Sequence, residues 1–145
     1  MDDPVEYDGA GELYRVIEAQ FGCAITLEGR LYSRLQKKST RLFLYAGGEP
    51  PCLRQSWIGL HIGDLSEGTI HPSIEGAQII GEKATKNVMR VSHEQADALF
   101  KEGSIEHKPF DGIVLVKSGQ NIICAAKHSN GRLVGLIPAS RKTTL

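Results

Sequence analysis

Residues 111–142 read DGIVLVKSGQNIICAAKHSNGRLVGLIPASRK and decide the fold class of this chain. Three short apolar runs occupy residues 113–116, 122–126 and 133–137. Gly119-Gln120-Asn121 and Ser129-Asn130-Gly131 separate them. Asn-Gly between two apolar runs is the strongest short hairpin signal in a sequence. The stretch therefore predicts a three-stranded antiparallel meander.

The charge of the chain is unevenly distributed, although its formal net charge is zero. No acidic residue follows Asp111, and residues 30–48 also hold basic residues without acidic ones. Residues 1–12, in contrast, hold acidic residues and no basic one. A meander with uncompensated positive charge is typical of a module that faces phosphates. The alternative is that these side chains are ordinary solvated lysines and arginines.

The basic residues form two candidate contact sets for an anionic partner. Lys127, His128 and Arg132 flank the Asn-Gly turn, where they could reach phosphates together. The other members of this C-terminal set are Lys117, Arg141 and Lys142. The N-terminal set is Arg34, Lys37, Lys38 and Arg41, and the nearby Tyr32 and Tyr45 could stack on unpaired bases. A solvated hairpin end and an edge strand protected by lysines are the structural alternatives.

The remaining sequence predicts an α+β protein of short elements with glycine-rich turns. Apolar spacing and capping residues indicate helices at 12–21, ended by Gly22, and at 93–102, capped by Ser92 with Gln95 and ended by Gly103. A third, short helix is expected at 73–77 after Pro72. Strands are expected at 41–46, 55–62 (with Gly63-Asp64 turning after it), 79–80 and 87–91. This order predicts a small closed or half-closed β-barrel with two or three helices at its ends.

Three segments resemble one known family in their order along the chain. They are residues 57–73, with the run Gly59-Leu60-His61-Ile62-Gly63 and a later Pro-Ser step, residues 90–103, and the closing strands of residues 112–141. Together they resemble the PUA-like domain at the C-terminus of the Sun/Nol1/Nop2-type RNA cytosine-5 methyltransferases. The resemblance implies a mixed-strand PUA-like pseudo-barrel at residues 51–145, preceded by a small α/β unit at 1–50. The family's expected Lys-Asn pair is replaced by Val134 and Gly135.

That resemblance implies RNA binding without catalysis, since a separate domain transfers the methyl group. We therefore expect an RNA-binding accessory protein, linked to RNA modification or ribosome assembly. Its expected partners are rRNA or tRNA and an RNA-modifying enzyme or ribosome-assembly factor. Two alternatives remain open. One is a small barrel enzyme acting on a modified base or nucleotide with His61, His71 or His128. The other is a protein-interaction module for a methyltransferase.

Cysteine and histidine usage gives no pattern for catalysis or metal binding. Cys52 follows a proline, as the nucleophile of cytosine-5 methyltransferases does, but the doubly wound fold that this chemistry requires is not indicated. Cys124 is expected to be a buried small apolar residue. His61 and His71 by themselves are a poor argument for a metal site, so no metal or cofactor is expected, and His61 is interpreted as a structural histidine. With neither a signal peptide nor a long apolar run, we expect a cytoplasmic monomer that does not contact membranes.

Overall fold

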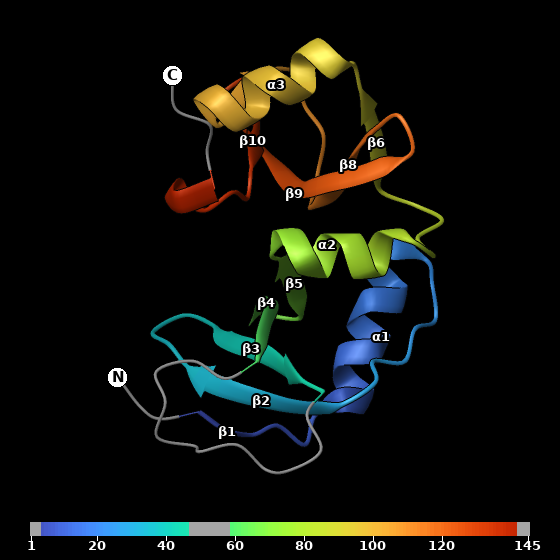
Figure 1. Cartoon of the computed structure of the whole chain (residues 1–145), viewed down its shortest axis with the longest axis vertical. Helices are drawn as coiled ribbons and strands as arrows, with labels where there is room; N and C mark the ends of the chain where they lie inside the picture. Colours follow the sequence, from blue (N-terminus) through green and yellow to red (C-terminus); the bar gives the residue numbers. More distant parts are fainter. Residues whose placement is uncertain (1–3, 47–58, 142–145) are drawn as a thin grey trace.

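The computed structural model describes residues 4–46 and 59–141, which form two five-stranded sheets (Figure 1). The first sheet has the order β1 (Val5–Glu6), β2 (Arg30–Leu35), β3 (Thr40–Tyr45), β4 (Leu60–Ser66) and β5 (Thr69–Pro72), and all its pairs are antiparallel. The second has the order β6 (Val88–Val91), β8 (Val114–Ser118), β9 (Asn121–Ser129), β10 (Arg132–Gly135) and β7 (Ser104–Glu106). Only its β6–β8 pair is parallel. The predicted α+β class and the meander are both confirmed.

Three α-helices and one 3₁₀ turn complete the described residues: α1 (Ala10–Phe21), α2 (Ile74–Gly81), α3 (His93–Glu102) and η1 (Ala139–Arg141). The ends of α1 and α3 lie where capping chemistry predicts them. Gly22 ends α1 with a φ of 67°, and its N–H donates to the Glu18 carbonyl. Ser92 and Gln95 form the predicted capping box of α3.

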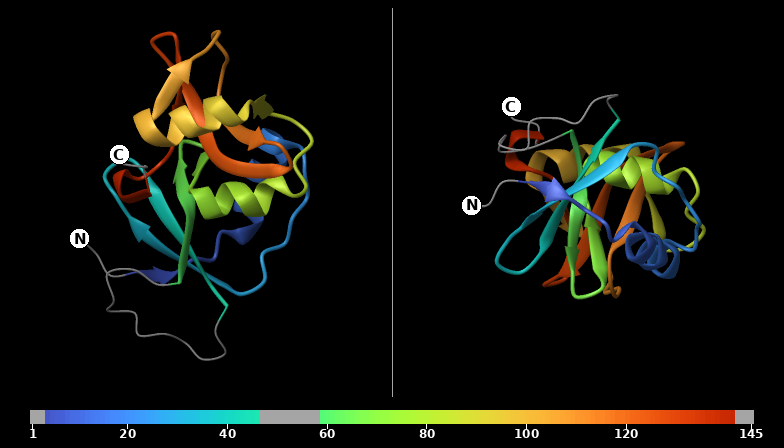
Figure 2. Two further views of the ribbon diagram at one scale, coloured as in Figure 1. Left: turned by 45° about the horizontal axis from the view of Figure 1, so that its top comes forward. Right: turned by 90° about the horizontal axis from the view of Figure 1, so that it is seen from below.

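The second sheet is buried on both faces because its strands alternate between two cores. Leu115 and Ala125 pack with α1, α2 and the first sheet. Val116 and Cys124 face α3 instead. Burial raises the pKa of the Cys124 thiol to about 12, so it behaves as the predicted small apolar residue. Helix α2 lies between the two sheets in both views (Figure 1, Figure 2).

Strand β4 continues beyond the turn that the sequence predicts at Gly63-Asp64, so that prediction is wrong. The chain turns at Glu67-Gly68, both with positive φ, because Leu65 of β4 pairs with Ile70 of β5 and both contact the core. The register against β3 shifts instead: Leu42 lies opposite Gly63, but Phe43 lies opposite His61. Ile62 is the extra residue of this β-bulge.

Residues 79–80 belong to α2, so the strand predicted there is also wrong. Ser73 caps the helix by accepting from the Gly76 N–H at 3.0 Å. From Ile74 to Ile80, residues at helical spacing then face the core. With the cap and this spacing together, a helix satisfies the local backbone, buries Ile80 and packs the half-buried Ile79 against the core.

The predicted division of the chain at residues 50 and 51 stays a prediction. Strand β3, on one side of it, pairs along its length with β4 on the other. Pairing within the first sheet therefore crosses the division. Cys52, Lys142 and the first residues of the strand predicted at 55–62 lie outside the described residues.

Helix α2 touches the bulge of β4 through a residue that must be glycine. The Ser73 N–H donates to the Ile62 carbonyl at 3.1 Å, and the Ser73 hydroxyl donates to the His61 carbonyl at 2.7 Å. A Cβ at Gly76 would overlap the carbonyl oxygen of Ile62. Any side chain here would push the helix away from the sheet.

Gly76→Ala should therefore lower the free energy of unfolding by about 2–3 kcal/mol, as overpacking of a rigid contact does. Gly11→Ala is the matched control. It also adds one methyl group to a helix, but its Cβ meets nothing closer than the Arg15 guanidinium at 3.8 Å. The control should leave stability unchanged or raise it by about 0.5–1 kcal/mol. Urea denaturation midpoints measure both changes, and equal midpoints in the two variants would contradict the close approach.

Candidate functional site

A hollow of about 540 Å³ opens where the two sheets meet. Its walls are the β4–β5 hairpin (residues 66–71), the loop before β8 (residues 110–113) and Lys127 and His128 of β9. We call it the β5–β9 cleft. His71 and His128 both line it, together with the carboxylates of Glu67 and Asp111. The cleft thus combines titratable groups of both signs with one large aromatic residue, Phe110.

The N-terminal basic set reaches the rim of this cleft. The Ser66 hydroxyl, in the cleft wall, donates to the Lys38 carbonyl at 2.8 Å. The turn between β2 and β3, closed by the Gln36 N–H donating to the Ser39 carbonyl at 2.8 Å, therefore lies against the cleft. Lys37 and Lys38 are exposed on that turn. The fold brings these lysines and Lys127, about ninety positions apart in sequence, to one region.

An aromatic cluster forms part of the cleft wall. The Phe110 ring centroid lies 5.5 Å from that of His107 and 5.4 Å from that of His128, with steep interplanar angles of 88° and 71°. We call these three residues the ring cluster. A second hollow of about 590 Å³, lined by residues 106–108 and 130–132, lies on the His107 side. The ring cluster therefore joins two adjacent hollows.

Arg132 lines that second hollow, whereas Lys127 lines the β5–β9 cleft, although the sequence analysis places them in one contact set. Its Nε donates to the Ser104 hydroxyl at 2.8 Å, and its Nη2 donates to the Ser104 carbonyl at 3.0 Å. These bonds tie β10 to β7 and use part of the guanidinium's donor capacity. Its contact with phosphate stays a prediction.

Arg34 is buried, with 6% of its surface exposed. Its guanidinium carbon lies 5.5 Å from the centroid of the Phe43 ring, a cation–π contact. Among the described residues, its Nε and Nη2 have no hydrogen-bond partner. Tyr32, at 2% exposed, is buried on the same face of the sheet. Burial disfavours the predicted contacts of Arg34 with a phosphate and of Tyr32 with a base.

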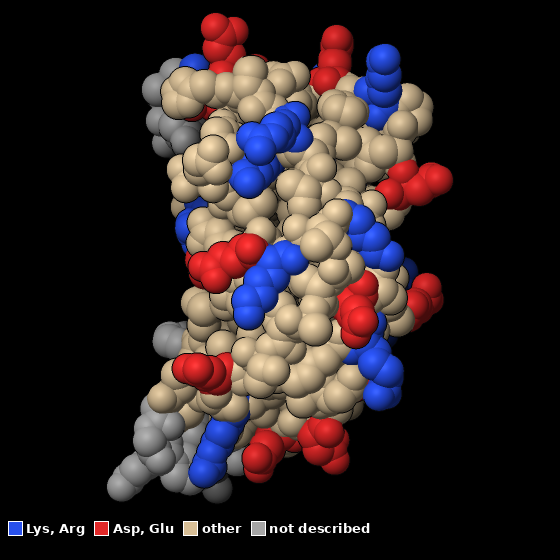
Figure 3. Space-filling view, turned by 90° about the vertical axis from the view of Figure 1, so that its right-hand side faces the viewer, with Lys and Arg blue, Asp and Glu red and all other residues tan. Residues whose placement is uncertain are grey.

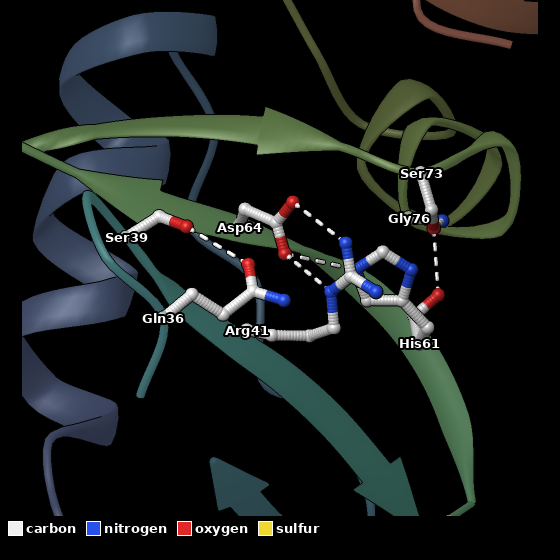
Figure 4. Close-up of polar contacts among 7 residues, drawn as sticks. All are labelled: Gln36, Ser39, Arg41, His61, Asp64, Ser73 and Gly76. Atoms are coloured by element: carbon white, nitrogen blue, oxygen red, sulfur yellow. Dashed lines mark hydrogen bonds and ion pairs between the residues drawn. The ribbon is translucent and has the colours of Figure 1, made fainter. Parts of the chain in front are cut away.

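Arg41 is held by an ion-pair network on the first sheet (Figure 4). Its Nε donates to Asp64 Oδ1 at 3.1 Å, and His61 Nε2 donates to the same oxygen at 3.1 Å. Burial alone would raise the pKa of Asp64, but the hydrogen bonds from His61 and Arg41 outweigh it and hold that pKa below its usual value. The bulge places His61 and Asp64 on one face, which agrees with the prediction that His61 is structural.

Two further predicted basic residues, Arg141 and Lys117, do not line the cleft. Arg141 Nη1 donates to Glu75 Oε1 at 2.6 Å, which ties η1 to the first turn of α2. Burial opposes the effect, but this bond and the positive charge lower the pKa of Glu75. Lys117 lines a separate polar hollow beside Gln78 and Glu82. Of the nine predicted residues that the structure describes, Lys37, Lys38, Lys127 and His128 therefore lie at the cleft or its rim.

The sequence analysis missed Phe110 as a site residue and gave His71 no binding role. The run His107-Lys108-Pro109-Phe110 interleaves basic and aromatic residues, which is a recognised signal for nucleic-acid contact.

The face that Figure 3 shows intersperses basic and acidic side chains, so no broad surface of one sign lies there. Across residues 4–46 and 59–141, no three metal-binding side chains are grouped. No helix in the same ranges is long and apolar enough to cross a membrane.

Comparison with known proteins depends on the fold, because no family model matches the chain and no curated protein sequence matches it. Among solved structures, a conserved PUA domain protein from Thermoplasma acidophilum is similar, with a TM-score of 0.63. The match covers 94% of each chain at 13% sequence identity. The chain has the fold of a PUA domain protein. The PUA-like pseudo-barrel expected from the sequence is confirmed, while the narrower likeness to methyltransferase domains gains no support from this match.

Within this PUA fold, the departure at Val134 and Gly135 has a packing explanation. The Gly135 N–H donates to the Gly103 carbonyl at 3.0 Å. A Cβ on Gly135 would lie 2.8 Å from Ile137 Cδ1 and 3.3 Å from Leu99 Cδ1. An asparagine would therefore displace core side chains here.

The Asp64 network predicts a specific dependence of stability on pH. Because the pKa of Asp64 is lowered on folding, its contribution is present above its ordinary value of 3.8 and is lost as pH falls through the lower folded-state pKa. Asp64→Asn should lower stability by about 2 kcal/mol at neutral pH and flatten the acid limb of the stability curve. Asp97→Asn, an exposed carboxylate on α3 beside His93, is the control. Urea unfolding from pH 3 to 7 checks the prediction, and parallel acid limbs in wild type and Asp64→Asn would contradict it.

Proposed function

We propose that this protein binds RNA through the β5–β9 cleft and its basic rim. The observation that carries the proposal is the meeting of two distant basic segments at one cleft, through the Ser66–Lys38 hydrogen bond and the position of Lys127. The PUA fold is consistent with it, since the resemblance noted in the sequence implies RNA binding. Phosphates would lie against the lysines and position the RNA.

Local charge supports the proposal although the whole chain is neutral. The cleft, its rim and the adjoining hollow hold five basic side chains and three acidic ones: Lys37, Lys38, Lys108, Lys127 and Arg132 against Glu67, Glu106 and Asp111. Such a small excess of positive charge attracts phosphates without making binding purely electrostatic. Salt should therefore weaken binding, but less steeply than for a strongly basic protein.

The finer parts of the proposal rest on the sequence resemblance. The RNA would be a structured rRNA or tRNA. The protein would act as a monomer that assists RNA modification or ribosome assembly, alongside an RNA-modifying enzyme or an assembly factor. In this proposal the protein contributes binding and performs no chemistry, since the resemblance is to a domain that accompanies a separate catalytic domain.

Titration with tRNA and with an rRNA fragment at about 50 and 200 mM salt tests the proposal. Lys127→Glu and Lys38→Glu should each weaken binding about tenfold, because each replaces an attractive charge with a repulsive one. Lys83→Glu is the matched control: it makes the same charge change on an exposed lysine just after α2 that does not line the cleft. An equal loss in all three variants would show a general charge effect and contradict the placement. Absence of binding at low salt would contradict the function itself.

A further inference from the structure

The ring cluster is a rigid surface whose planar faces are not stacked on one another. Its two ring pairs, Phe110 with His107 and Phe110 with His128, meet edge to face. His128 is further held by a 3.3 Å contact between its Nε2 and the His107 carbonyl. His107 Nδ1 lies 2.9 Å from the Lys108 carbonyl. These contacts orient the rings before any ligand binds, which lowers the entropic cost of recognition.

The space beside the cluster is suited to a flat ligand. Phe110 and His128 both line the β5–β9 cleft, whose volume of about 540 Å³ lies in the range usual for small-ligand sites. The second hollow meets the cluster at His107, with Lys108 beside it. Lys127 thus lines one of the two hollows that the ring cluster joins, and Lys108 lines the other. A strand of RNA that crossed the ring cluster could place phosphates toward both lysines and a flat base against the ring of Phe110.

Hydrogen-bonding groups inside the cleft complement the edges of a nucleobase. Asp111 offers a carboxylate that accepts hydrogen bonds, and Thr69 offers a hydroxyl that donates or accepts. An exocyclic amino group is a fitting donor for Asp111. A phosphate would instead be repelled by it, so the part of the cleft beside Asp111 favours a base and the lysines favour phosphates.

On the basis of the proposed RNA-binding function, we propose that an unpaired nucleobase stacks on the ring of Phe110 inside the β5–β9 cleft, with His128 at the edge of the base. The preferred ligand is then a single-stranded segment or loop and not a continuous duplex. In a duplex both faces of every internal base are covered by its neighbours, so the rings could not reach them. Stacking on aromatic residues tolerates any base, because every base has a flat face.

The test compares three RNA probes of equal length: an unstructured single strand, the same strand with abasic sites, and a duplex. Wild-type protein should bind the intact single strand about tenfold more tightly than the abasic strand or the duplex. Phe110→Leu, which keeps apolar packing but removes the ring, should abolish this preference and leave binding to the abasic strand unchanged. Phe110→Tyr should keep it. Phe100→Leu is the control, an equal change in another half-buried phenylalanine, which lines a different hollow on α3.

Equal wild-type affinities for the three probes would overturn the base-stacking inference and leave phosphate binding in place. Loss of affinity for all three probes in Phe110→Leu, with an unchanged melting temperature, would overturn it too. Failure of the wild-type protein to bind any probe at low salt would overturn the RNA-binding function itself. The wild-type comparison does not depend on any variant folding.

Discussion

The carbonyl of Ile62, at the bulge in β4, is the point on which the arrangement of the two sheets depends. It accepts the Ser73 N–H, and the missing side chain of Gly76 lets α2 approach it. Helix α2 then packs on β9 with its other face, where a Cβ on Gly81 would collide with the Ile122 side chain. Both contacts are close because both helix positions are glycine. The first sheet is thereby held against the second, and the β5–β9 cleft lies along their junction.

Arginines and lysines have separate roles in this fold. The guanidinium groups of Arg41, Arg132 and Arg141 bind protein acceptors, and Arg34 lies over an aromatic ring. Lys37, Lys38 and Lys127 are instead exposed around the cleft. A planar guanidinium fits fixed acceptors and rings, whereas a strongly hydrated ammonium group on a flexible stem stays in water. Counting both residue types together therefore overestimates the surface that an anion can reach.

Most of the local structure was predictable because its causes are local. The turn at Asn130-Gly131 and the Ser92 capping box are set by residues within four positions of each other. One error arose because pairing with the next strand overrode a local turn signal. The sequence predicts a turn at Gly63-Asp64. In the structure both residues belong to β4 and pair with β5, which makes the hairpin longer. Among the site residues, Lys127 and His128 were predictable from charge, while Phe110 required the position of its loop against β9.

By itself, the sequence determined the fold class, the meander, the caps of α1 and α3 and the presence of two basic segments. Hydrophobic periodicity, turn-forming residues and helix caps depend on residues close together in sequence, so they can be predicted from the sequence alone. Only the tertiary structure decided that Lys127 lines a cleft whose wall contacts the Lys38 backbone, that Arg34 is buried, and that His61 and Asp64 share a face. The physical reason is that burial and proximity arise from packing between elements far apart in sequence, and that a single bulge residue reverses the side of a strand on which later side chains lie.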